Sequence, residues 1–402
     1  MAALPHPLHV DLERARYLVS PAGRAALAAI PLDAGRDDPN RLVSTLRRLH
    51  PPARASALAE QATLRARAAG RFGRDYGLLL TAPGLEMMTH PLVAERRARR
   101  LARTGMPVAD LTCGLGGDLA ACAAHGTEVA GVEIDPPTAL LAKANVPAAS
   151  IVTGDAARPP LRLDGLALIL DPARRTAARR TFDPDAFSPS WETCLDLLRE
   201  APTGVLKAPP GLDRERVPPW TEMEAVQLGT GMREVTLWAG AGATAGLRRA
   251  VLLPAGAELT SGAPECPELP VPVDRYVFDP ESCVTRAGLV RHLGHRLGAR
   301  LLDSQVAYLT GSLPAFDPLA ATFEVLEVVP FSVRRLKDFL ASRSWRPHEI
   351  RRRAFPVEPD ELRRLLGRLT GDPVTLLCTT VGGNRVVMIV RRLSPGPGAP
   401  GA

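Results

Sequence analysis

The chain has 402 residues, of which 46% are hydrophobic and 23% charged, and its formal net charge is +7. This composition is that of a globular protein, and the length favours two or three domains over one. We expect neither a membrane helix nor a signal peptide, because no apolar run reaches the roughly 18 residues of a membrane helix and the N-terminus lacks the basic and apolar segments of a signal peptide. We therefore expect a cytoplasmic protein with no membrane contact.

Six cysteines are spread along the chain without a Cys-x-x-Cys pair or a neighbouring histidine cluster. This spacing argues against a disulfide framework and against a zinc site. We expect buried free thiols in a reducing compartment and no bound metal. The cysteines are Cys113, Cys122, Cys194, Cys266, Cys283 and Cys378.

Positive charge is concentrated near the C-terminus. Residues 334–392 hold 14 basic and 6 acidic side chains, and their net charge of +8 accounts for all of the +7 of the chain. Only three basic residues are lysines, so a compositional bias toward arginine also contributes, and arginine abundance alone does not indicate nucleic-acid binding. The distribution of charge indicates a basic C-terminal segment that would attract an anionic partner.

The first 100 residues are expected to be helical, because Ala, Leu and Arg recur there at helical spacing between proline and glycine breaks. In the last of these helices Thr89 is a candidate N-cap, and Pro91 fits the first turn. The predicted helices are 21–30, 40–49, 52–71 and 89–102.

From residue 108 onward short apolar strands alternate with helices, which predicts a parallel sheet covered on both faces. Two late strands close this sheet, and the proline- and glycine-rich segment 254–272 is expected to be a linker or peripheral loop. The predicted strands are 108–112, 128–134, 150–153, 166–170, 203–208, 233–239 and 248–254. The predicted helices between them are 119–125, 137–145 and 191–199.

The C-terminal part has a β-α-β-α-β-β pattern, which predicts a small α+β domain. Its last two strands flank Val381-Gly-Gly-Asn, a hairpin turn. The proline- and glycine-rich residues 394–402 predict a disordered tail. A short helix is expected at 288–297, and the strands and helices of the pattern at 323–329, 332–342, 348–353, 359–369, 374–380 and 386–391.

A glycine-rich motif, Asp-Leu-Thr-Cys-Gly-Leu-Gly-Gly-Asp at 110–118, follows the first strand and opens a helix. Glycines let the backbone turn sharply and approach a ligand, and the free N–H groups at the helix start face that ligand. Asp110, Thr112, Gly114 and Gly116 are therefore candidate cofactor-binding residues. A turn of this kind also occurs as a purely structural element.

Acidic residues follow the next three strands. Glu133 ends the second strand, where a carboxylate accepts from both hydroxyls of a ribose in dinucleotide sites. Asp155 follows the third strand and would accept from an adenine amino group, and Asp171 follows the fourth. Because the carboxyl ends of parallel strands meet at one edge, these side chains are expected in one crevice.

This order of motifs resembles the Rossmann-like class I S-adenosylmethionine-dependent methyltransferases. The resemblance implies that the motif at 110–118 and Asp155 surround the cofactor, that Glu133 binds its ribose, and that Asp171 lies beside the transferred methyl group. The sequence departs from the pattern at Thr112, where many members have glycine. NAD is the competing ligand, but the Asp-x-x-x-Gly-x-Gly-Gly spacing and the Asp-Pro element favour S-adenosylmethionine.

The acceptor side differs from amino-group methyltransferases, which carry Asn/Asp-Pro-Pro followed by an aromatic residue that helps to hold a flipped base. Here Asp171 is followed by Pro-Ala-Arg-Arg, which argues against methylation of an exocyclic amine. Arg174 and Arg175 are candidates to bind a phosphate or carboxylate of the substrate, with a helix cap or surface ion pair as the alternative. Lys207 ends the fifth strand and is a candidate catalytic residue that contacts substrate or assists proton removal.

As a whole, the chain resembles a bacterial methyltransferase family with a THUMP-like domain at its C-terminus. The resemblance rests on the glycine-rich motif, on Leu-Asp-Pro-Ala-Arg-Arg, on Leu-Lys-Ala-Pro-Pro-Gly-Leu-Asp, and on the segments 348–357 and 381–387. It implies a helical region at 1–100, a catalytic domain at 101–260 and a basic α+β domain at 273–393.

THUMP domains are associated with RNA, so the resemblance implies a methyltransferase of tRNA or rRNA whose basic end positions the substrate. Arg351 and Arg353 are candidate phosphate contacts, because three consecutive arginines on a strand cannot all point into a core. A solvated arginine-rich surface is the structural alternative. Two other functions stay open, namely a methyltransferase of a small molecule or protein and a non-catalytic RNA-binding protein with a degenerate cofactor fold.

Overall fold

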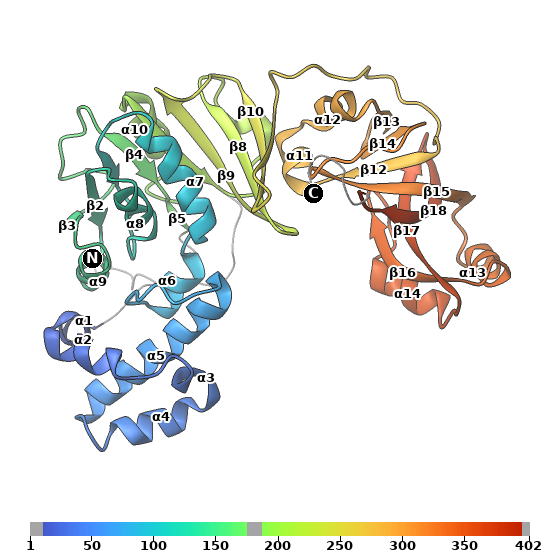
Figure 1. The fold of residues 1–402 in the computed structure, drawn as a ribbon. Helices are drawn as coiled ribbons and strands as arrows, with labels where there is room; N and C mark the ends of the chain where they lie inside the picture. Colours follow the sequence, from blue (N-terminus) through green and yellow to red (C-terminus); the bar gives the residue numbers. More distant parts are fainter. Residues whose placement is uncertain (1–10, 175–186, 396–402) are drawn as a thin grey trace. The chain divides into compact units, whose positions relative to one another are not determined.

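The computed structural model describes residues 11–174 and 187–395 (Figure 1). The chain forms two compact units, which are described separately. The first contains the residues up to Glu222 together with Thr236–Gly246, and the second contains Met223–Val235 and the residues from Leu247 onward. The domain boundaries expected near residues 100, 260 and 273 stay predictions.

The first unit begins with helices, as predicted, and polar side chains fix where several of them start. Ser20 caps α2 by accepting from the Gly23 N–H at 3.1 Å, and Pro21 follows at the first helical position. Thr81 caps α6 through its hydroxyl in the same way. The helices are α1 (Leu12–Val19), α2 (Pro21–Ala28), α3 (Ala34–Asp37), α4 (Pro39–Leu46), α5 (Pro52–Phe72), α6 (Ala82–Met87) and α7 (Pro91–Ala102).

In the sheet that follows, the strands of the first unit are arranged in the order β7-β4-β1-β2-β3. Strands β1, β2, β3, β4 and β7 pair in parallel, as predicted, and the chain reverses direction across the sheet between β1 and β4. Ligands of open α/β sheets bind at such a switch point, at the carboxyl ends of the strands. These strands are β1 (Val108–Asp110), β2 (Val129–Glu133), β3 (Ser150–Thr153), β4 (Ala167–Leu170) and β7 (Thr203–Ala208), and the helices between them are α8 (Gly117–Ala124), α9 (Pro136–Asn145) and α10 (Trp191–Glu200).

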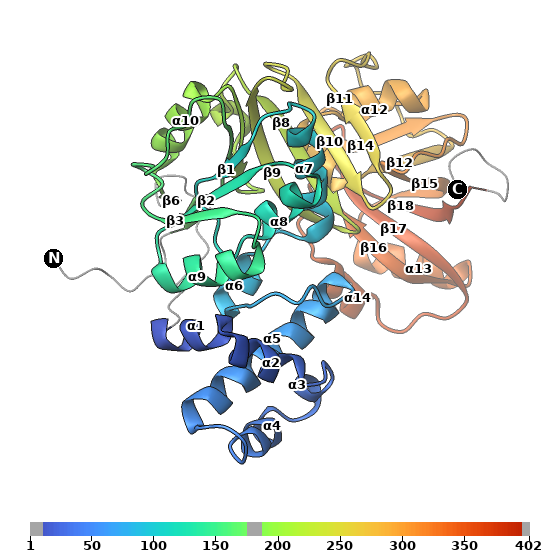
Figure 2. The ribbon, with the colours of Figure 1, turned by 60° about the vertical axis from the view of Figure 1, so that its left-hand side comes forward.

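The N-terminal helices pack onto the part of the sheet domain that carries the glycine-rich turn. Leu18 of α1 and Leu115 of the turn belong to one buried apolar cluster, and α1 lies beside α9 in both views (Figures 1 and 2). Asn145, at the end of α9, donates to the carbonyl oxygens of Leu79 and Leu115 at 2.9 and 3.0 Å. The helical region therefore braces the turn from the side of α9.

Four late strands are present where two are predicted: β8 (Glu222–Leu228), β9 (Gly231–Gly240), β10 (Arg248–Leu253) and β11 (Ala257–Thr260). The strand β8 was not predicted, because Glu222, Glu224 and Gln227 interrupt its apolar pattern, although all three side chains are buried. The prediction of a linker or peripheral loop at 254–272 is wrong at β11, which pairs antiparallel with β10. Two short strands, β5 (Ala173–Arg174) and β6 (Phe187–Ser188), and a 3₁₀ turn at Arg214–Arg216 complete these connections.

The second unit contains a seven-stranded sheet with the order β13-β14-β12-β15-β18-β17-β16. Its end follows the predicted β-α-β-α-β-β pattern, and the β17–β18 hairpin turns at Gly382 and Gly383, which both have positive φ. The predicted disordered tail lies outside the described residues from 396 onward. The elements are β12 (Tyr276–Pro280), α11 (Ser282–Ala287), α12 (Val290–Leu297), β13 (Arg300–Asp303), β14 (Val306–Gly311), β15 (Ala320–Pro330), α13 (Val333–Ser342), β16 (Trp345–Arg352), α14 (Pro359–Leu366), β17 (Asp372–Val381) and β18 (Asn384–Leu393).

Candidate active site

The glycine-rich turn lies at the switch point, between the end of β1 and the start of α8. Asp110, the last residue of β1, accepts a hydrogen bond from the Thr112 N–H at 3.0 Å, which starts the turn. Gly114 and Gly116 have φ angles of +53° and +85°, a region that glycine enters without strain. A Cβ atom at Gly116 would lie 2.8 Å from Val146 Cγ2, so this position needs glycine for space as well.

Glu133, at the end of β2, is joined to this turn through its carboxylate. One carboxylate oxygen accepts from the Gly114 N–H at 3.0 Å, and the other accepts from the Asp135 N–H at 2.9 Å. These two N–H groups fix the direction of a side chain that is only 5% exposed.

Asp155 lies at the neighbouring strand end. β3 runs beside β2 with Thr153 opposite Glu133, and the Gly154 N–H donates to the Glu133 carbonyl oxygen at 3.0 Å. The Asp155 side chain is exposed and accepts from the Ala157 N–H at 2.8 Å. The two acids expected to face ribose and adenine therefore stand at adjacent strand ends, on one edge of the sheet.

Thr112 connects the turn to the segment that follows β4. Its hydroxyl oxygen accepts from the Asp171 N–H at 2.7 Å. A glycine at this position, as in many class I methyltransferases, would lack that acceptor. The threonine therefore has a structural role in holding the backbone of Asp171.

Lys207, in β7, has its ammonium group at the centre of a buried polar network. Nζ donates to Asp171 Oδ2 at 2.7 Å, to Asp118 Oδ2 at 2.8 Å and to the Thr89 hydroxyl. An ammonium group has three N–H donors, and these acceptors can use all of them. The side chains of Lys207 and Asp118 are each 8% exposed, whereas that of Asp171 is 41% exposed, so Asp171 is the member that meets solvent.

Asp118 and Arg97 also belong to this network. Asp118 was predicted only as part of the motif at 110–118, and Arg97 was not predicted to have a role. Asp118 lies in the first turn of α8, and its Oδ1 accepts from the Arg97 guanidinium of α7. Arg97 is buried and falls between Val93 and Leu101 on the apolar face of its helix. An arginine at a core-facing position of a helix was therefore the signal in the sequence that could have found it.

Thr89 does not cap α7, so the N-cap prediction is wrong by one residue. Pro91 is the first residue of the helix, which makes His90 the cap, and His90 Nδ1 accepts from the Leu92 N–H at 3.3 Å. The Thr89 hydroxyl instead lies 3.1 Å from Asp118 Oδ2 and accepts from Lys207. The segment before β1 thus contributes directly to the network.

The charges of this site shift the pKa values of two acids in opposite directions. Burial and the neighbouring Asp118 carboxylate raise the pKa of Asp110 to about 7, against the influence of Lys207. Burial acts on Asp118 as well, but Arg97 and Lys207 outweigh it and hold the pKa of Asp118 below its usual range. At neutral pH Asp118 is therefore an anion, whereas Asp110 keeps its proton to a higher pH than an ordinary aspartate does.

Of the other predicted site residues, two belong to the second unit, and the side chains of the other two lie outside the described part of the chain. Arg174 belongs to β5, which pairs with β6, and Arg175 lies outside the described residues. Arg351 and Arg353 belong to the second unit, where each guanidinium group lies 2.8 Å from the Asp279 carboxylate. Their positive charge is partly neutralised within the protein.

The parallel sheet, its switch point and the acids at its strand ends define a class I methyltransferase. The chain belongs to a family of S-adenosylmethionine-dependent methyltransferases that includes an uncharacterized member from two strains of Mycobacterium tuberculosis. It is 36% identical to that relative over 345 residues, which cover 82% of this chain and 94% of the relative. Both the predicted enzyme class and the predicted cofactor are thereby confirmed.

Two family models match parts of the chain, a THUMP domain-like model at residues 320–392 and a domain of unknown function at residues 11–68. A crystal structure from Porphyromonas gingivalis, described as a methyltransferase, shares the fold with a TM-score of 0.73 at 21% identity. The similarity covers 96% of this chain and all of that chain. The predicted fold class, a Rossmann-like methyltransferase sheet with a C-terminal THUMP-like domain, is confirmed.

All six cysteines are free and buried, as expected from their spacing. Among the residues that the structure describes, no helix is both long and apolar enough to cross a membrane. Within the same ranges, no cluster of three or more His, Cys, Asp or Glu side chains is arranged to hold a metal ion.

Proposed function

We propose that this S-adenosylmethionine-dependent methyltransferase acts on RNA, with the cofactor held at the switch point and the RNA held by the basic C-terminal domain. The observation that carries the RNA assignment is the net charge of +8 at 334–392, within the segment that matches the THUMP domain-like model. Neutralisation of backbone phosphates by such a surface releases counterions and supplies most of the sequence-independent affinity for nucleic acid.

The ion pairs of this basic segment support the same assignment. Arg351, Arg352, Arg353 and Arg391 are each paired with a carboxylate. The other basic side chains of 334–392 form no ion pair with any described carboxylate, so their charge is available to an anionic partner. The phosphate contacts are therefore expected to come from a subset of these unpaired arginines rather than from Arg351 and Arg353.

The residues at the switch point fit S-adenosylmethionine. Gly114 is open, since a Cβ atom there would meet no atom of the described residues within 4 Å apart from its chain neighbours, and a ligand could approach its backbone closely. Glu133 presents a buried, oriented carboxylate to accept from ribose hydroxyls, and Asp155 presents an exposed one to accept from the adenine amino group. Asp110, Thr112 and Gly116 hold the shape of the turn.

Asp171 is proposed to orient the acceptor group of the substrate by accepting a hydrogen bond from it. Asp171 suits this role because it is the member of the network that is exposed to solvent. S-adenosylmethionine supplies a methyl group activated by a positively charged sulfur. Lys207 is proposed to position Asp171 rather than to remove a proton, because an ammonium group that donates to three acceptors has no lone pair. Orientation of this kind supplies much of the rate of a displacement reaction.

To test this function, the purified protein is incubated with methyl-labelled S-adenosylmethionine and with total RNA from cells that lack the protein. Label is expected in RNA, and mass spectrometry of the nucleosides then identifies the modified base. Asp171→Ala should abolish incorporation, whereas Asp164→Ala, at an exposed acid before β4, should not. RNA affinity should also fall steeply as salt rises. Label that enters only protein or small molecules would contradict the RNA assignment and favour the alternative acceptors.

A further inference from the structure

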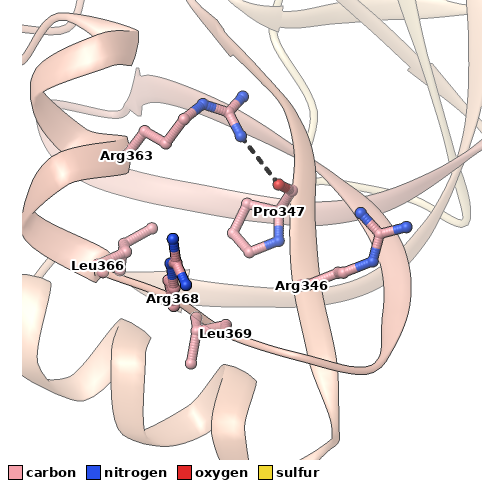
Figure 3. A pocket seen from close by; sticks show the side chains of 7 residues that line it. Arg346, Pro347, Arg363, Leu366, Arg368 and Leu369 are labelled. Carbon is pink, nitrogen blue, oxygen red and sulfur yellow. Dashed lines mark hydrogen bonds between the residues drawn. The ribbon is translucent and has the colours of Figure 1, made fainter.

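A small basic pocket lies between β16 and α14 of the second unit (Figure 3). Its volume of about 160 Å³ is well below the roughly 300–1,000 Å³ of pockets that enclose a drug-sized ligand. It therefore fits one small group rather than a whole nucleotide cofactor. Its lining includes Arg346, Pro347, Arg363, Leu366, Arg368 and Leu369.

Two of the three arginines are held in place by backbone carbonyl groups. Arg363 donates to the carbonyl oxygens of Pro347 and His348 at 3.1 and 3.2 Å, and Figure 3 shows the first of these bonds. Arg346 donates through Nε to the Gly371 carbonyl oxygen at 3.1 Å. Because a guanidinium group has five N–H donors, both retain donors for a ligand, and side chains fixed in advance lose less entropy on binding.

The positive charge of the pocket is not neutralised by the described part of the protein. Arg346, Arg363 and Arg368 form no ion pair with a described acidic residue, whereas Arg352, on the same strand as Arg346, pairs with Glu358. Arg368 also makes no hydrogen bond with a described residue. The pocket therefore concentrates unpaired cations around a small apolar floor.

The C-terminal end of α14, which borders the pocket at Leu366, opposes anion binding. The free carbonyl groups there carry a partial negative charge of about half an elementary charge. Lys337 adds a fourth full positive charge nearby, with its Nζ 3.6 Å from the place of a Cβ on Gly367. Four full charges outweigh the helix end, so the local field attracts an anion.

We propose that this pocket binds a phosphate group of the RNA substrate, with Arg363 and Arg368 as the main contacts and Arg346 at its edge. A phosphate suits the site because arginine forms bidentate hydrogen bonds with its oxygens and the volume admits a single such group. Leucine and proline side chains line the pocket beside these cations. This assignment rests on RNA as the substrate, and it identifies the place where the basic domain binds a phosphate group of that RNA.

Arginine-specific modification with phenylglyoxal, read by peptide mass spectrometry on the full chain, tests the site directly. Inorganic phosphate at constant ionic strength should slow the modification of Arg363 and Arg368, and a single-stranded RNA oligonucleotide should do so as well. Arg334 and Arg335 of α13 serve as controls, because they are exposed and form no ion pair with a described residue. Equal protection of all four arginines by both probes would overturn a discrete site.

A matched pair of double variants measures how much the pocket contributes to RNA affinity. The double substitution R363Q/R368Q should weaken RNA binding by about tenfold and lower the salt slope by about one per lost contact. R334Q/R335Q removes the same charge and should have a much smaller effect. The single variant R368Q controls for misfolding of the double variant. Arg368 makes no hydrogen bond or ion pair with a described residue, so its replacement should leave the fold intact. Equal losses in the two double variants would reject the pocket but leave RNA as the substrate, whereas phosphate protection without RNA binding would reject RNA as the source of the phosphate.

Discussion

Lys207 Nζ lies 2.7 Å from Asp171 Oδ2, and the parallel register of β4 and β7 explains why. Leu170 is paired with Leu206, so Asp171 and Lys207 are the next residues along two adjacent strands. The same ammonium group contacts Asp118, which is in turn held by Arg97. Lys207 therefore stands between two carboxylates that would otherwise repel each other.

Replacement of Lys207 with methionine should disrupt both the site and the stability of the first unit. Loss of one partner of a buried ion pair costs about 3–5 kcal/mol, and misplacement of Asp171 should slow methyl transfer by about 100-fold or more. Melting temperature and label incorporation measure the two effects. Lys143→Met is the control, because the Lys143 ammonium lies at an exposed helix end and, among the described residues, donates only to the carbonyl oxygens of Pro147 and Ala149. A K207M protein that melts and reacts like the wild type would refute the positioning role.

The substitution Glu133→Ala should weaken the binding of S-adenosylmethionine by about tenfold or more, because hydrogen bonds to a charged group contribute roughly 1.5–3 kcal/mol each. It also removes the acceptor that orients the Gly114 N–H. Isothermal titration calorimetry measures the affinity. Glu128→Ala, at the exposed opposite end of the β2 region, should bind as the wild type does. Unchanged affinity of the E133A protein would remove Glu133 from the cofactor site.

The parallel core of the sheet could be predicted because each strand is a short apolar run that ends in a polar motif. The strand at Ser150–Thr153 matches its prediction at both ends. β8 could not be predicted in this way, because its buried acids look like surface residues until their partners are known. Glu222, for example, accepts from Arg100 at 2.7 Å and from the Thr244 N–H at 3.0 Å, and both partners lie more than 20 residues away in the sequence.

The strand-end acids of the site were predictable, but the network around Lys207 was not. Motif spacing places Glu133, Asp155 and Asp171 at the ends of strands, which is enough to bring them to one edge. The contacts with Thr89 and Arg97 depend on how α7 packs against α8, and no local pattern encodes that packing. The number of arginines near the C-terminus likewise predicted the basic domain. The geometry of the ion pairs decides which of these arginines remain available to an anionic partner.

The six cysteines should be inert in the folded protein. All are buried, and burial raises the pKa of Cys122, Cys194, Cys283 and Cys378 to about 12. The thiolate is the reactive form, so Ellman's reagent at pH 8 should react with almost no thiol before denaturation and with six after it. Rapid reaction of even one thiol per native chain with Ellman's reagent would show that a buried thiol is accessible.

Asp110 should make the stability of the first unit depend on pH. Its pKa in the folded protein is raised from 3.8 to about 7, so between these values the folded state holds a proton that the unfolded chain has lost. The stability contributed by this proton is present below pH 4 and is lost as the pH rises through 7. Asp110→Asn does not titrate, so its melting temperature relative to the wild type should rise between pH 5 and pH 8.

The full effect corresponds to roughly 4 kcal/mol at most, at 1.36 kcal/mol per pKa unit. Groups other than Asp110 titrate in both proteins, so their contribution cancels in the difference. Asp164→Asn, at an exposed acid, should show no such trend. A difference between D110N and the wild type that stays constant across this range would mean that Asp110 is ionised throughout. The Asp118 carboxylate, which Arg97 and Lys207 keep charged, would then not act on Asp110 as the geometry requires.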